Sequence, residues 1–231
     1  MSTSQTEAKT GFIDRLSTFL QKFRIVFLVL LIAVISASIG YFIWKEWQQR
    51  AREKSSLWSE RAQELYQKWS TEQDLDKKQP TEKELADLMQ NILRKYPREN
   101  AAQRAYFLTA EMAYRNKDWQ KAAASYETLS RKFPRSYLAS LSLMSAGACY
   151  EELGDGKKAI TAYERLTERY RDSFLVPHAL LSIGRLKESE GDYTGAVEAY
   201  NRLEDDYPLS NWTKAGRNRI IDLKIKGKIS E

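Results

Sequence analysis

The stretch GDYTGAVEAYNRLEDDYP, residues 191–208, decides the fold, because the chain carries the same pattern three more times. Moving back 37 residues at a time gives GDGKKAITAYERLTERYR (154–171), KDWQKAAASYETLSRKFP (117–134) and PTEKELADLMQNILRKYP (80–97). Each copy places apolar residues at helical spacing, and three of the four end in proline. An internal repeat of this length indicates a stack of helical hairpins.

Each repeat is predicted to contain two helices joined by a tight turn. Gly-Asp at 154–155 and at 191–192 marks that turn, with Lys117-Asp118 at the same place in an earlier copy. Small residues let the helices approach closely, and aromatic residues fill the space between one hairpin and the next. The recurring positions are Ala122, Ala159 and Ala196; Tyr126, Tyr163 and Tyr200; leucines 129, 166 and 203; and, in the preceding helix, Ala110, Gly147 and Gly184.

This set of positions resembles the tetratricopeptide repeat. The spacing from Tyr106 to Pro134, from Leu143 to Arg171 and from Leu180 to Pro208 matches that family without a gap. The period here is 37 residues, whereas the family's is about 34. The resemblance implies an all-α fold, in which residues 81–231 form an α-solenoid of about three full repeats with partial capping units at each end.

Residues 25–44, IVFLVLLIAVISASIGYFIW, form an uncharged apolar segment of 20 residues. At about 1.5 Å per residue this is enough to cross a hydrocarbon core of about 30 Å. A cleaved signal peptide is the alternative, but its apolar region is shorter and a small-residue cleavage site follows it. Here aromatic and charged residues follow at once, so we expect an uncleaved transmembrane anchor.

The flanks of this segment are also predicted to be helical. Residues 1–24 are expected to be a cytoplasmic tail with a short amphipathic helix, and residues 45–80 a helical stalk. The apolar face of the tail consists of Phe12, Ile13, Leu16, Phe19, Leu20 and Phe23. The apolar stripe of the stalk consists of Trp47, Ala51, Trp58, Ala62, Leu65 and Trp69, and it could pair between copies of the chain.

Lys and Arg are nearly equal in number on the two sides of residues 25–44, so charge leaves the orientation open. A short tail, one anchor and a large C-terminal domain form the usual layout of a signal-anchor protein. We therefore expect a single-pass protein of the bacterial cytoplasmic (inner) membrane, with its N-terminus in the cytoplasm. The repeat domain would then lie in the periplasm or elsewhere outside the cytoplasm.

Several kinds of chemistry are not expected. The net charge of +6 is mild and the repeat region is nearly balanced, which disfavours nucleic-acid binding. Cys149, the single cysteine, falls at an apolar helix position and is expected to be a buried packing residue. His178, the single histidine, has no partner fixed by the sequence pattern. We predict no catalytic, metal or cofactor site, and the chain is not expected to be an enzyme.

We expect the protein to act through a surface that binds other proteins. In the resembling family the first helix of each repeat lines a concave groove that takes an extended peptide or a helix. Carried onto this chain, the groove residues are Arg104, Phe107, Glu111 and Tyr114; Leu141, Met144, Ala148 and Glu151; and His178, Leu181, Arg185 and Glu188. Phe107, Met144 and Leu181 form an apolar row, for which ordinary packing between first helices is an equal alternative.

Two functional classes remain open. In layout the chain resembles the YfgM-type ancillary subunits of the SecYEG translocon, with related repeats in envelope proteins of the BamD and cell-division coordinator type. That resemblance implies protein partners: the translocon, periplasmic chaperones or envelope assembly factors. A module of this kind would assist envelope protein translocation, folding or assembly. The alternative is a structural scaffold subunit of a large envelope complex.

Overall fold

The computed structural model describes the backbone of residues 4–230 and the side chains of residues 22–26 and 28–230. Within that range the regular secondary structure is helical throughout, which confirms the predicted all-α fold class. The chain divides into two compact units, one ending at Lys54 and the other beginning at Ser55. The apolar face predicted for residues 12–20 lies outside the described side chains.

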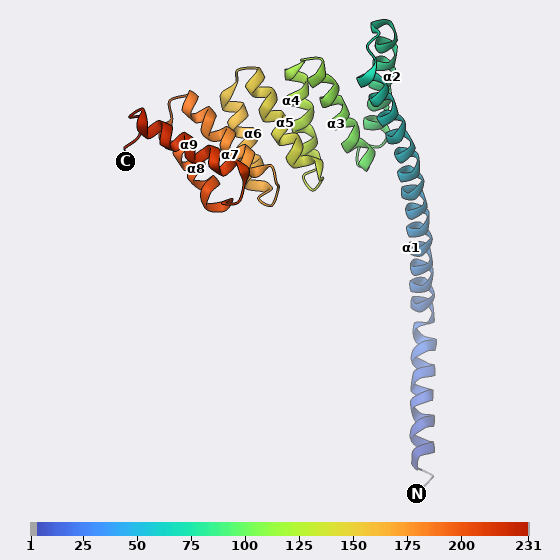
Figure 1. The fold of residues 1–231 in the computed structure, drawn as a ribbon. Coiled ribbons are helices and arrows are strands. Elements are labelled where there is room, and N and C mark those ends of the chain that lie inside the picture. The colour runs from blue at the N-terminus through green and yellow to red at the C-terminus, as the bar shows by residue number, and fades with distance from the viewer. Residues whose placement is uncertain (1–3, 231) are drawn as a thin grey trace. The chain divides into compact units, whose positions relative to one another are not determined.

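The first unit is formed by the N-terminal part of helix α1 (Ser4–Thr71) (Figure 1). The described apolar side chains between Ile25 and Trp44 are exposed. By length and composition the helix could cross a membrane, and none of its most apolar window is buried. The hydroxyl of Ser38 donates to the carbonyl of Val34 at 2.8 Å, so this polar group needs no water.

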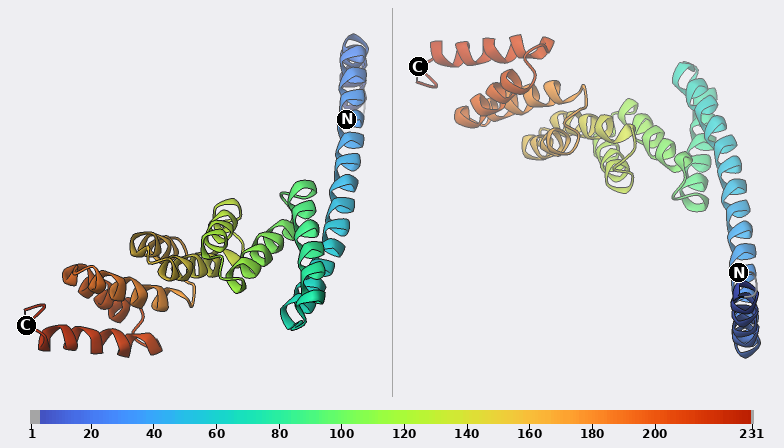
Figure 2. Two further views of the ribbon diagram at one scale, coloured as in Figure 1. Left: turned by 90° about the horizontal axis from the view of Figure 1, so that it is seen from above. Right: turned by 90° about the horizontal axis from the view of Figure 1, so that it is seen from below.

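The second unit begins within α1 and continues through eight further helices of the described chain, whose succession can be followed in Figures 1 and 2. These are α2 (Leu75–Lys95), α3 (Asn100–Arg115), α4 (Trp119–Lys132), α5 (Leu138–Glu152), α6 (Gly156–Arg169), α7 (Val176–Ser189), α8 (Tyr193–Asp206) and α9 (Asn211–Ile225). Each helix from α2 onward packs against the next one in the chain, as a solenoid of hairpins requires.

The unit begins earlier than residue 81, inside the segment that we expected to be a stalk. Ala62, Leu65 and Trp69 of α1 are buried with apolar residues of α2 and α3, so the end of α1 acts as the first helix of an additional hairpin. Asp74 caps the next helix by accepting the backbone N–H of Asp76 at 3.0 Å. For this reason α2 begins at Leu75 and contains Pro80, where the sequence suggested a boundary.

The turns inside the hairpins follow one chemical plan. An aspartate caps the second helix by accepting a backbone N–H three residues ahead, and the residue before it adopts a positive φ. The capping residues are Asp118, Asp155 and Asp192, which follow Lys117 (φ 60°), Gly154 (φ 70°) and Gly191 (φ 81°). Glycine adopts this conformation without steric cost, whereas lysine does not.

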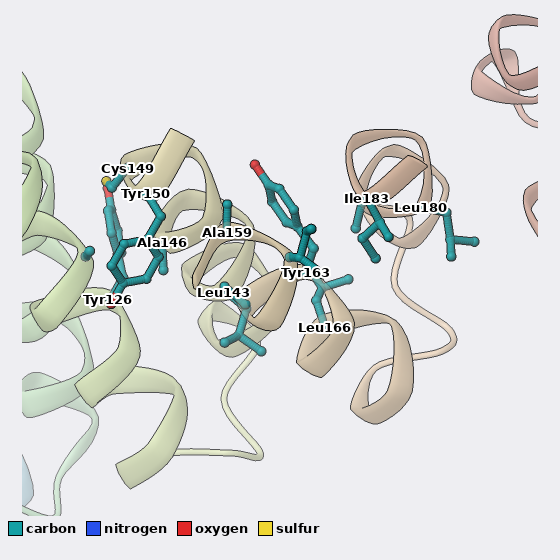
Figure 3. Close-up of a cluster of buried hydrophobic side chains, with 14 of the residues drawn as sticks. Tyr126, Leu143, Ala146, Cys149, Tyr150, Ala159, Tyr163, Leu166, Leu180 and Ile183 are labelled. Carbon is teal, nitrogen blue, oxygen red and sulfur yellow. The ribbon is translucent and has the colours of Figure 1, made fainter. Parts of the chain in front are cut away.

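The core lies between successive hairpins, where Tyr126, Tyr163 and Tyr200 are almost completely buried. Figure 3 shows the first two of these tyrosines among their neighbours. A Cβ atom on Gly147 would lie 2.2 Å from Cε1 of Tyr163, and one on Gly184 would lie 2.2 Å from Cε1 of Tyr200. The two glycines therefore let the tyrosine rings lie directly on the preceding helix. This explains why glycine recurs at these positions.

Hydroxyl groups at the corners tie each repeat to the one before it. Tyr170 donates to the carbonyl of Pro134 at 2.9 Å, and Tyr207 donates to the carbonyl of Arg171 at 2.9 Å. The acceptor is a backbone group in both cases, so the bond is kept although arginine replaces proline at 171. These bonds fix the spacing between hairpins along the unit.

Candidate functional site

The candidate surface is the partly exposed side of the first helices α3, α5 and α7, which we call the first-helix face. It contains the twelve residues proposed from the sequence. Its apolar row, Phe107, Met144 and Leu181, is half-buried and packs against the main core. The ring of Phe107 meets that of Tyr126 edge-on, with 5.8 Å between centroids. The row is thus partly core and partly surface.

The acidic residues of the face turn toward the protein. Glu151 accepts hydrogen bonds from the Tyr163 hydroxyl at 2.7 Å and from Nη2 of Arg185 at 2.7 Å. Each bond joins Glu151 to a different helix: the first to α6, and the second to α7 of the next repeat. The carboxylate therefore connects two successive hairpins.

The same arrangement recurs one repeat later. Glu188 accepts from the Tyr200 hydroxyl at 2.5 Å and from Nε of Arg219 at 2.9 Å, and its second oxygen accepts from Nη2 of Arg219. Only 9% of the Glu188 side chain is exposed. Glu188 therefore attaches α9 to the last full repeat.

In the first full repeat the buried tyrosine hydroxyl is also bonded to a carboxylate, but the glutamate stands at a different position. Position 114, which corresponds to Glu151, is a tyrosine, and the Tyr126 hydroxyl donates to Glu111 instead. Position 110, which corresponds to Gly147, is alanine, whose Cβ is incompatible with the ring position seen in the later repeats. The alanine at position 110 and the use of Glu111 as the acceptor therefore occur in the same repeat.

Burial has a clear effect on the three tyrosine hydroxyls. Removal from water raises the pKa of Tyr126, Tyr163 and Tyr200, and hydrogen bonding to the neighbouring carboxylates raises it further. These hydroxyls stay protonated and act as permanent donors. The bonds are structural, so Glu111, Glu151 and Glu188 are already engaged within the protein.

Sequence reasoning did not identify Arg219 or the tyrosine hydroxyls as part of this surface. One signal was present in the sequence: a glutamate and a tyrosine twelve residues apart recur as 151/163 and 188/200. The partner arginines carry no such signal, since Arg185 lies 34 residues after Glu151 and Arg219 lies 31 residues after Glu188.

His178 lies at the C-terminal end of the face. Its ring stacks on that of Trp212 in α9, with 4.3 Å between centroids and 7° between the planes. Burial lowers the pKa of His178, and the nearby Arg185 lowers it further. The closing helix therefore covers this part of the predicted groove.

The accessible part of the face is smaller than the sequence suggested. Arg104 and Arg185 are exposed, and Leu141 and Tyr114 are 36% and 37% exposed. The Tyr114 ring packs edge-on against Trp119 at 4.8 Å, which holds it in place. Together with the outer edges of the apolar row, these residues offer an apolar strip with arginine at its margin.

Cys149 is fully buried, which confirms the predicted packing role. Burial raises the pKa of its thiol to about 12, with a contribution from the carboxylates of Glu111 and Glu152. Among the side chains that the structure describes, no group of three or more His, Cys, Asp or Glu residues is placed to hold a metal ion.

Comparison with protein families agrees with this architecture. A family model described as "Tetratricopeptide repeat-like domain" matches residues 18–144. The chain belongs to this family. A second model, "Tetratricopeptide repeat", matches residues 146–211. Tetratricopeptide repeat (TPR) domains generally mediate protein–protein interaction and are generally not enzymes, so the second unit is a protein-binding TPR unit.

One solved structure shows the same fold at low identity, and two others are similar to a lower degree. The apo form of RapI aligns with a TM-score of 0.52 and 14% identity, over 76% of this chain and 70% of RapI. The N-terminal domain of stress-induced protein-1 (STI-1) from C. elegans has a TM-score of 0.44 and 20% identity, over 51% of this chain and 93% of that domain. The Sgt2 TPR domain from Aspergillus fumigatus has a TM-score of 0.43 and 21% identity, over 56% and 85%. No curated protein matches the chain.

Proposed function

We propose that this TPR protein is a single-pass membrane protein whose repeat unit binds other proteins of the bacterial envelope. Its role would be to assist their translocation, folding or assembly. One observation carries the proposal: helix α1 contains both an exposed apolar segment and the first buried helix of the TPR unit. The family match begins at residue 18 and so includes both parts.

The proposed orientation has the N-terminus in the cytoplasm and the TPR unit outside it. The proposal follows the signal-anchor layout, in which the large domain after the apolar stretch is the part usually exported. Alkaline phosphatase fused after Glu231 should be active, and a reporter that works only in the cytoplasm should be inactive at the same point. The opposite pair of results contradicts the orientation.

The proposed binding surface is the exposed strip of the first-helix face around Leu141 and Tyr114. By the resemblance to YfgM-type proteins, its partners are the SecYEG translocon, periplasmic chaperones or envelope assembly factors. Affinity purification from gently solubilised membranes should recover such proteins. The variant Leu141→Glu should lose them, while Lys157→Glu, at the exposed start of α6, should keep them. Equal recovery by both variants contradicts this choice of surface.

The alternative role as a scaffold that pairs through its stalk has less support. Ala62, Leu65 and Trp69 of the predicted stripe are buried inside the TPR unit and are not available to a second copy. Trp47 is 74% exposed, and pairing would have to depend on it and its neighbours. If the TPR unit binds partners through the first-helix face, a Trp47→Ala variant should leave partner recovery unchanged. A loss of recovery together with a smaller assembly would favour the scaffold role.

A further inference from the structure

The corners between hairpins expose large apolar side chains at equivalent positions. Tyr137 lies before α5 and Phe174 lies two residues before α7, 37 residues later in the chain. They are 76% and 85% exposed, whereas polar residues would be expected at corners that face only water. The corresponding positions at the two ends of the repeat array, 100 and 211, are both asparagine. At this repeat position an exposed aromatic residue is thus found only at the two central corners, while the last corner exposes Leu209 at a different position, with 98% of it accessible.

The same corners carry a cluster of positive charge. The exposed cations are Arg94, Lys95 and Arg98 at the first corner, Arg131, Lys132 and Arg135 at the second, and Arg169 and Arg171 at the third. Several of them contact neutral groups: Arg94 the Asn91 amide, Arg131 the Thr128 hydroxyl, Lys132 the Tyr106 hydroxyl and Lys95 the Trp58 ring. Those contacts leave the positive charge of the first two corners uncompensated, whereas the exposed Glu168 and Asp172 balance the two arginines of the third corner.

These corners lie along one edge of the TPR unit. Successive helices are antiparallel, so corners between hairpins fall on one edge and the turns inside hairpins fall on the other (Figure 1). The first corner contacts the start of the unit, since the ring of Tyr96 packs edge-on against that of Trp58 at 5.5 Å. Trp58 is three residues from Ser55, where the unit begins. The basic edge is therefore next to the point at which the chain enters the unit.

We propose that this edge, from residue 94 to residue 174, docks on the surface of a bilayer that contains anionic lipid. Exposed aromatic side chains beside Lys and Arg are the combination that favours the membrane interface, where rings enter the headgroup layer and cations meet lipid phosphates. The charge is complementary to an anionic surface at the first two corners. The corner between α8 and α9 has Glu204, Asp205 and Asp206 in place of these cations, with Glu204 paired to Arg217 and Asp206 to Arg202, and it lies beyond the docking edge.

The inference rests on the proposed anchor, because a tether makes weak docking sufficient. Once residues 25–44 are inserted, the edge meets the bilayer as an intramolecular event at high effective concentration. Docking would fix which way the first-helix face points relative to the membrane. It would thereby orient the face toward partners that are themselves embedded in or emerging from that membrane.

The test uses the full chain reconstituted in liposomes of phosphatidylcholine with or without phosphatidylglycerol. A fluorophore is attached through Tyr137→Cys or Phe174→Cys, with Lys157→Cys on the opposite edge as control, and lipids with a quencher in the headgroup region are included. The parent chain gives the background, since Cys149 is buried. Quenching is expected at 137 and 174 in anionic liposomes and not at 157.

Charge variants separate docking from mere proximity. Replacing Arg131 and Arg135 by Ser should weaken docking by roughly 30-fold, because each cation near an anionic surface contributes about fivefold. The matched variant Lys121→Ser with Lys157→Ser removes the same charge from the opposite edge and should have no effect. The proposal is overturned if quenching is equal at positions 137 and 157. It is also overturned if quenching at position 137 or 174 does not change when Arg131 and Arg135 are replaced.

Flotation of the same liposomes tests the membrane anchor separately from the docking edge. If the chain floats with the lipid but the fluorophore at 174 is not quenched, the docking edge is rejected and the anchor stands. If the chain does not float with the lipid, the anchor is rejected, and docking is rejected with it, since the edge alone is then shown not to hold the chain on the bilayer.

Discussion

Arg219 of the closing helix donates hydrogen bonds to both carboxylate oxygens of Glu188, a residue that the sequence placed in the binding groove. The pair joins α9 to α7 and leaves the carboxylate only 9% exposed. It therefore works as a structural clamp at the end of the TPR unit. The partner-binding strip must be sought closer to the middle of the unit, around Leu141.

Arg219→Ala should lower the free energy of unfolding by about 1–3 kcal/mol, because it leaves a nearly buried carboxylate without its charged partner. The exposed guanidinium keeps the effect below that of a fully buried pair. Arg217→Ala is the matched control, since its pair with Glu204 is far more exposed and is worth about 0–1 kcal/mol. Chemical denaturation of both variants makes the comparison, and equal losses would contradict the clamp.

Gly184→Ala should be strongly destabilising, because the new Cβ would lie 2.2 Å from the Tyr200 ring, inside a packed core. Overpacking of this kind costs about 1–3 kcal/mol or more. Gly156→Ala is the control, as its Cβ would meet only the end of the Glu190 side chain at 3.1 Å. Thermal melting should separate the two variants clearly, and a Gly184→Ala protein that melts like wild type would show that the predicted contact is absent.

Lys117→Gly should stabilise the chain by about 1 kcal/mol, because Lys117 has a φ of 60°, where any residue with a Cβ is strained. Gly154→Ala and Gly191→Ala test the same physics in reverse, since both glycines have a positive φ in equivalent turns. Those two changes should each destabilise by a similar amount. The measurement is the midpoint of urea unfolding. Relative to wild type, Lys117→Gly should raise this midpoint and the two glycine variants should lower it, and a shift in the same direction for all three would contradict the prediction.

The stability of the TPR unit should fall as the pH drops below about 6.5, and His178 should be one cause. The pKa of His178 is ordinarily 6.5 and is lowered in the folded chain by burial and by Arg185. Below that ordinary value the unfolded state binds the proton first, so the free energy of unfolding decreases as the pH falls. His178→Phe keeps a ring for stacking on Trp212 and should flatten this dependence between pH 7 and 5.

The repeat register could be predicted from the sequence because it depends on buried residues of distinctive size. Tyr163, Tyr200 and the glycines beneath them recur at one period, and the structure gives them the packing role that the pattern indicates. The boundary near Pro80 was less predictable. Proline suggested a helix start, but the Asp74 cap and the burial of Trp69 begin the unit earlier.

The binding surface was harder to predict than the fold, because a charged residue at a groove position looks the same whether it faces solvent or a buried hydroxyl. Glu151 and Glu188 were expected to line the groove and are paired within the protein, and the arginines that pair with them follow no repeat spacing. In the first full repeat the carboxylate moves to Glu111, three residues before the position that the register implies. Only the packed side chains show these partners.

The most direct test of the central claim, that the first-helix face binds protein partners at the membrane, is site-specific photo-crosslinking in intact cells. A photoreactive amino acid at Leu141, the exposed apolar residue at the middle of the face, should give discrete crosslinked products in the membrane fraction. The same amino acid at Lys157 should give none. Discrete products from position 157 with none from position 141 would contradict the claim.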